Sequence, residues 1–71
     1  MSIKNDRQLS LAAHTRAGRV SRILSSIDEL LYNGARLKPA DRKLLDQVDC
    51  DLERLAVWAE RIHASISDRQ P

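Results

Sequence analysis

The sequence predicts an all-α fold: two long antiparallel helices, at about residues 6–33 and 39–68, that form a coiled-coil-like helical hairpin. Three observations predict it. Glycine and proline punctuate the chain around residues 34–38, hydrophobic residues recur every three or four positions on both sides, and no segment alternates like a β-strand. We expect one domain of 71 residues, with a turn at 34–38 and tails at 1–5 and 69–71.

Local signals set the predicted helix ends. Asn5 followed three residues later by Gln8 is a capping-box pattern, which starts a helix. Asn33 and Gly34 both tolerate the left-handed conformation that ends one, and Pro39 suits the first turn of the next because that turn needs no N–H there. The segment between them is therefore predicted to be a short turn.

Hydrophobic periodicity predicts how the two helices pair. The second helix carries an unbroken heptad pattern, formed by Leu45, Val48, Leu52, Leu55, Ala59, Ile62 and Ile66. The first helix shows a similar pattern with one charged member, Arg16, among Leu9, Ala13, Val20, Ile23, Ile27 and Leu30. In an antiparallel hairpin, residues whose numbers sum to about 75 or 76 would lie opposite one another, and the hydrophobic positions then match.

Gly18 falls in the middle of the predicted first helix, where glycine is unfavourable. In the predicted pairing it lies near Trp58, so close packing against that ring would explain it. The alternative is a break into two shorter helices near residue 18.

A chain of this length rarely stabilises itself with one core, and its single cysteine, Cys50, excludes internal disulfides. Hydrophobic residues also lie outside the main pattern, so a lone hairpin would leave them in water. We expect a homodimeric four-helix bundle or obligate binding to a different protein. The residues predicted to form this dimer or partner interface are Ala17, Leu24, Leu31, Leu44, Val57 and Trp58.

The sequence contains no motif of a named reaction, so we expect no enzymatic activity, no cofactor and no metal. His14 and His63 are interpreted as ordinary surface histidines because no further ligands accompany them. The lone cysteine, the absence of a signal-peptide core and the lack of a membrane-spanning segment favour a soluble cytoplasmic protein.

Two functions are compatible with these features. The first is a small regulatory protein that binds another protein through a helical face, as an adaptor, an inhibitor or an antitoxin-like protein of a mobile element or phage would. The alternative is a dimeric helical hairpin that binds RNA or DNA, with phosphate contacts from Arg16, Arg19 and Arg22. Acidic residues in the opposite arm and the shortage of aromatic residues count against the second.

Overall fold

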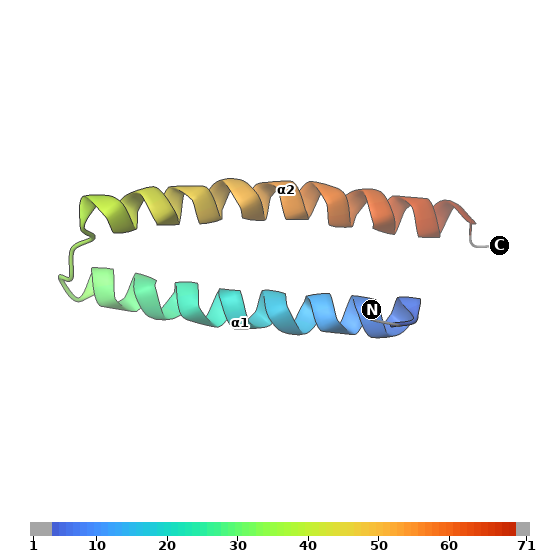
Figure 1. Cartoon of the computed structure of the whole chain (residues 1–71), viewed down its shortest axis with the longest axis horizontal. Coiled ribbons are helices and arrows are strands. Elements are labelled where there is room, and N and C mark those ends of the chain that lie inside the picture. The colour runs from blue at the N-terminus through green and yellow to red at the C-terminus, as the bar shows by residue number, and fades with distance from the viewer. Residues whose placement is uncertain (1–3, 70–71) are drawn as a thin grey trace. The chain divides into compact units, whose positions relative to one another are not determined.

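The computed structural model describes residues 4–69, which form two helices and no strand, as the sequence predicts. Helix α1 runs over Asp6–Tyr32 and helix α2 over Pro39–Arg69 (Figure 1). All four helix ends lie within one residue of the predicted ones. The chain divides between Arg36 and Leu37 into two units, each built around its own helix. The antiparallel pairing and the bundle therefore stay predictions. Of the tails predicted at residues 1–5 and 69–71, residues 1–3 and 70–71 lie outside the described residues, and Arg69 is the last residue of α2.

The capping box predicted at the start of α1 is confirmed. The side-chain Oδ1 of Asn5 accepts a hydrogen bond of 2.8 Å from the backbone N–H of Gln8. In return, the Oε1 of Gln8 accepts one of 3.1 Å from the backbone N–H of Asn5. Each bond satisfies a backbone donor that the first turn leaves without an intrahelical partner. Asp6, in the first turn, adds a carboxylate near the positive end of the helix dipole.

Helix α1 ends where glycine allows the backbone to turn. Gly34 has a φ of 101°, a conformation that other residues rarely adopt. The Gly34 N–H donates to the Leu31 carbonyl over 3.1 Å, and the Ala35 N–H donates to the Leu30 carbonyl over 3.0 Å. These two bonds form a Schellman motif, which satisfies carbonyls of the last turn. The predicted helix stop at residues 33 and 34 is confirmed.

Helix α2 begins at Pro39, also as predicted, but without a side-chain cap of the kind that starts α1. The Lys38 carbonyl accepts the first bond of the helix from the Arg42 N–H over 2.9 Å, so Lys38 holds the cap position. Its ammonium group has only donors and cannot accept from the free N–H groups. Proline at the first position and Asp41 in the first turn are the favourable features here.

Helix α1 continues through Gly18 without a break, so the alternative of two shorter helices is wrong. A methyl group at Gly18 would meet no atom within 4 Å outside the neighbouring helix backbone. Gly18 also lies on the side of α1 away from its main hydrophobic residues. Helix α1 by itself therefore gives no reason for a glycine here, and the packing against Trp58 stays a prediction.

No side chain among residues 4–69 is buried. The helices instead present their hydrophobic residues at the surface or half-buried, which makes those residues the main feature of each unit. A folded domain normally hides such residues in a core.

The two glycines provide a matched test of this description. We expect Gly34→Ala to destabilise the protein by about 1–2 kcal/mol, because alanine disfavours the left-handed backbone at the end of α1. We expect Gly18→Ala to stabilise it by about 1 kcal/mol, because alanine is the better helix former and the position is open. Thermal and urea unfolding followed by circular dichroism would measure both. A destabilised Gly18→Ala protein would instead support the packing against Trp58.

Candidate interaction surface

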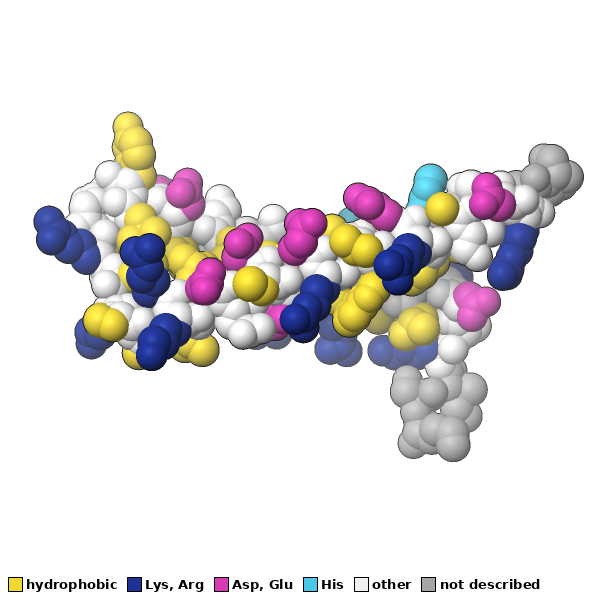
Figure 2. Space-filling view, turned by 90° about the horizontal axis from the view of Figure 1, so that it is seen from above, with side chains coloured by type: hydrophobic (Ala, Val, Ile, Leu, Met, Phe, Trp, Pro, Cys, Tyr) yellow, Lys and Arg dark blue, Asp and Glu magenta, His cyan; other side chains and the backbone are white. Residues whose placement is uncertain are grey.

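Large hydrophobic side chains are exposed along both helices. On the face drawn in Figure 2, hydrophobic side chains lie between acidic and basic ones. Exposed apolar residues scattered singly are normal, but here they recur at helical spacing. Among the described residues the exposed large hydrophobic residues are Leu9, Leu11, Ile23, Leu30, Tyr32, Leu37, Leu44, Leu55, Val57, Trp58, Ile62 and Ile66.

The half-buried residues of α1 define a continuous hydrophobic stripe. Among its large hydrophobic residues only Val20, Leu24, Ile27 and Leu31 are half-buried, and they are spaced four, three and four apart. Ala13 and Ala17 extend the same spacing toward the N-terminus. We call these six residues the α1 stripe: Ala13, Ala17, Val20, Leu24, Ile27 and Leu31.

The α1 stripe differs from the main pattern that the sequence predicted for this helix. It contains Leu24 and Leu31, which the sequence placed in a second row, and it contains no charged residue. Arg16 is exposed and lies about 60° round the helix from the middle of the stripe. The single charge predicted within the hydrophobic face of α1 therefore lies beside the stripe.

The stripe of α2 follows the predicted heptad pattern. We call it the α2 stripe: Leu45, Val48, Leu52, Leu55, Ala59, Ile62 and Ile66. Its first three residues are half-buried, and the others are exposed. The second half of α2 thus carries hydrophobic residues that its own unit leaves in contact with water.

Three predicted interface residues of α2 lie outside its stripe. Leu44 and Trp58 border one edge of it and are 66% and 55% exposed. Val57 lies on the opposite side of the helix and is 37% exposed. Residues at the edge can widen the contact made by the stripe, whereas Val57 would contact a different partner surface.

The three predicted phosphate-binding arginines, Arg16, Arg19 and Arg22, are all exposed on α1. They belong to a stretch, residues 7–27, that contains four arginines and no acidic residue. Asp28 and Glu29 follow immediately. After Asp6 at its first position, the charge of α1 is thus divided along its length, basic through residue 27 and acidic at Asp28 and Glu29.

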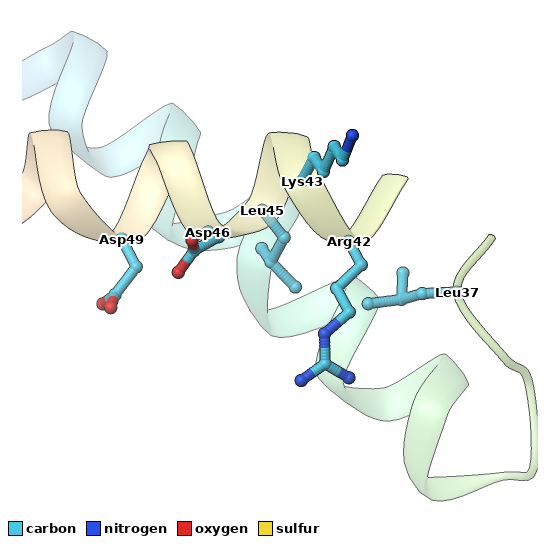
Figure 3. A pocket seen from close by; sticks show the side chains of 6 residues that line it. All are labelled: Leu37, Arg42, Lys43, Leu45, Asp46 and Asp49. Carbon is cyan, nitrogen blue, oxygen red and sulfur yellow. The ribbon is translucent and has the colours of Figure 1, made fainter. Parts of the chain in front are cut away.

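An open depression lies beside the first turns of α2. Leu37 precedes the helix and points toward the same space as Arg42 and Leu45, whereas Lys43 points away (Figure 3). The carboxylates of Asp46 and Asp49 complete the lining. From the sequence, Leu37 is expected only as part of the turn at residues 34–38.

The positions of Leu37 and Arg42 explain this depression. They are the N′ and N4 positions of α2, where a hydrophobic staple fixes how the chain enters a helix. The leucine before Lys38-Pro39 is the sequence signal for such a staple. We therefore interpret the depression as part of the structure that starts α2 and not as a ligand site. In it, the alkyl stem of Arg42 lies beside Leu37.

Metal-binding side chains are not brought together in the described part of the chain. No three metal-binding side chains cluster within residues 4–69. His14, His63 and Cys50 are each exposed. Neither of the described helices has an apolar stretch of the length that a lipid bilayer requires. No protein-family model, no curated protein and no solved structure matches the chain.

Leu55 and Leu11 separate the effect of the α2 stripe from that of exposure alone. They are 51% and 55% exposed, but only Leu55 belongs to a stripe. We expect Leu55→Glu to lower stability by about 2 kcal/mol or more, because the stripe must be covered when the protein is assembled. Leu11→Glu should change it by less than about 0.5 kcal/mol. Urea unfolding measures the stability of both variants. Equal losses of stability would contradict the idea that the α2 stripe matters more than other exposed hydrophobic positions.

Proposed function

We propose that this chain is a small regulatory protein without enzymatic activity, which assembles as a homodimeric helical bundle and binds another protein through a helical face. It would act as an adaptor, an inhibitor or an antitoxin-like protein of the kind encoded by mobile elements and phages. The observation that carries the proposal is the pair of uncovered stripes in a chain with no buried side chain among residues 4–69.

The energetic reason is the cost of leaving these stripes in water. Fully covering one leucine or isoleucine side chain contributes about 1.5–3 kcal/mol. The exposed members of the α2 stripe, Leu55, Ile62 and Ile66, would each contribute part of that amount. Two helices without a covering surface gain none of it, so association is the route by which this sequence can stabilise its fold.

A homodimeric bundle can cover the stripes without any protein other than a second copy of this chain. In the proposed hairpin, α1 and α2 pair antiparallel through residues whose numbers sum to about 75. Trp58 then lies level with Ala17, where a large side chain meets a small one. A second copy covers the hydrophobic residues that remain, as in other dimeric bundles.

A separate strip remains for the regulatory partner. Cys50, Val57 and Ala64 are seven residues apart on the outer side of α2, where a bundle exterior normally carries charge. Val57, at the centre of this strip, is 37% exposed. We assign the partner contact to this strip, with Val57 at its centre.

The oligomeric state tests the first half of the proposal. The 8.1 kDa chain should sediment as a species of about twice that mass at micromolar concentrations, with a thermal midpoint that rises with concentration. Analytical ultracentrifugation and circular dichroism make both measurements. A monomer with a cooperative transition independent of concentration would contradict the need for a covering surface.

Partner capture tests the second half. We expect the native protein to capture one protein from its host, and Val57→Glu to abolish this while leaving the dimer intact, because a charge at an interface centre must be desolvated. Leu11→Glu is the matched control, since it adds the same charge at another exposed position. Equal capture by native and Val57→Glu proteins would exclude this strip.

A nucleic-acid-binding dimer is the second candidate, favoured by the acid-free stretch at residues 7–27 and the exposure of its arginines. If the chain binds nucleic acid, replacing Arg16, Arg19 and Arg22 with glutamine would lower its affinity for RNA or DNA and would also reduce the salt dependence of that binding. A mobility-shift assay with RNA and DNA at low salt decides the matter. No binding there, or binding unaffected by the substitutions, removes this candidate.

A further inference from the structure

We propose that Asn33 and Gly34 form a self-modification site, at which Asn33 loses its side-chain amide by deamidation at a rate set by opening of the end of α1. The substrate is the chain itself, and the co-reactant is water. The inference goes beyond the proposed function and does not rest on the dimer, since it concerns only the turn that ends α1 within its own unit. A protein shown to be monomeric would leave it standing.

The pair carries the groups that the reaction needs. The backbone nitrogen of Gly34 loses its proton to hydroxide and attacks the side-chain carbonyl carbon of Asn33. A new C–N bond closes a five-membered imide, the bond to the side-chain nitrogen breaks, and ammonia leaves with a proton from water, which regenerates the hydroxide. Water then adds to either carbonyl of the imide and leaves aspartate or isoaspartate at position 33. Nothing is oxidised or reduced.

Glycine makes position 34 the favourable nucleophile. A side chain on the residue after an asparagine hinders approach of the backbone nitrogen, and glycine has none. Both residues are exposed, and a methyl group at Gly34 would meet no atom within 4 Å, so hydroxide can reach the N–H. The chain's other asparagine, Asn5, precedes the bulkier Asp6. Its Oδ1 also accepts the 2.8 Å bond from the Gln8 N–H. Deamidation is therefore expected at Asn33 alone.

The folded end of α1 holds the pair out of the reactive geometry. Asn33 has a φ of −84° and a ψ of 10°, which directs the next backbone nitrogen away from the side-chain carbon that it must attack. The Gly34 N–H donates to the Leu31 carbonyl over 3.1 Å, and a hydrogen-bonded N–H gives up its proton less readily. The Ala35 N–H donates to the Leu30 carbonyl over 3.0 Å and closes the same turn. Ring closure therefore requires this Schellman motif to open.

The reaction rate then measures how often this end of α1 opens. Helix ends open at a much smaller free-energy cost than the whole domain, so the rest of α1 can stay folded. The last turn contains no basic residue to offset the negative end of the helix dipole, and Asp28 and Glu29 lie nearby. The end of α1 is thus less well stabilised than its start.

Deamidation makes the opening permanent. An aspartate at position 33 adds a negative charge at the negative end of the dipole. Isoaspartate inserts a methylene group into the backbone, so the hydrogen bonds of the Schellman motif no longer match. The modified chain consequently has a shorter α1 and a looser connection to α2.

Peptide mapping by mass spectrometry tests the site. After incubation of the full chain at mildly alkaline pH in heavy-oxygen water, we expect Asn33 to gain the mass of a carboxyl group that contains one heavy oxygen, and Asn5 to stay unchanged. Asn33→Gln should abolish the gain, because the longer side chain must close a six-membered ring, which is much slower. Equal reaction at both asparagines, or none at Asn33 in the chain unfolded by guanidinium chloride, would overturn the assignment.

Proline substitutions test control by the helix end. The native chain should deamidate on the order of tenfold more slowly than the unfolded chain. Ala35→Pro removes the N–H that bonds to the Leu30 carbonyl and should speed the native reaction about fivefold, as expected for one lost hydrogen bond. Arg36→Pro is the matched control, since within residues 4–69 the Arg36 N–H makes no backbone hydrogen bond, and its rate should equal the native one.

Each rate is divided by that of the same variant in guanidinium chloride, which removes differences in intrinsic reactivity. Circular dichroism checks that the helices are retained. If Ala35→Pro loses them, Tyr32→Gly replaces it, because glycine weakens only the last turn and should speed the reaction about twofold. A native rate equal to the unfolded one, or a helical variant of the last turn that reacts no faster than the native chain, would exclude control by the end of α1.

Discussion

The constraint on which the rest of this molecule depends is that neither helix can cover its own hydrophobic residues. A helix satisfies its internal backbone hydrogen bonds within itself, but a stripe along one side needs a surface from elsewhere. No side chain over residues 4–69 reaches full burial, although the chain encodes two long stripes. Each stripe therefore needs a partner helix, from the same chain or from another.

Helix boundaries decide which part of each stripe is available for association. The capping box at Asn5 and the Schellman motif at Gly34 limit α1 to 27 residues, and Pro39 starts an α2 of 31 residues. Lengths of about 40 and 46 Å follow at 1.5 Å per residue. Six residues join the helices, so the connection can extend at most about 20 Å. A parallel pairing of α1 and α2 along their full lengths within one chain is thereby excluded, and an antiparallel one is possible.

The helix ends could be predicted from the sequence because their causes are local. Asn5 and Gln8 are three residues apart, and Gly34 needs only its own backbone conformation. Contacts between residues far apart in the sequence are harder to predict, because many registers of two helices satisfy a heptad pattern almost equally well. That is why the pairing of the helices and the interface residues on them stay predictions.

The hydrophobic face of α1 shows what periodicity leaves undecided. Two hydrophobic rows share Val20 and Ile27, one through Arg16 and the other through Leu24. Periodicity alone does not distinguish them, since both repeat every three and four residues. Half-burial follows the row through Leu24, which contains no charged residue. Gly18 lies in neither row, and its packing against Trp58 stays a prediction.

Symmetry links the proposed dimer to the proposed partner binding. In the proposed homodimeric bundle, the outer strip of α2 at Val57 is not consumed by dimerisation and occurs twice in each dimer. A partner that is itself two-fold symmetric can then engage both strips at once, and its second contact forms at high effective concentration. A monomeric partner would bind as two independent copies. Conditions that dissociate the dimer would reduce affinity for a symmetric partner far more than for a monomeric one, so the regulatory contact depends on the dimer interface without touching it.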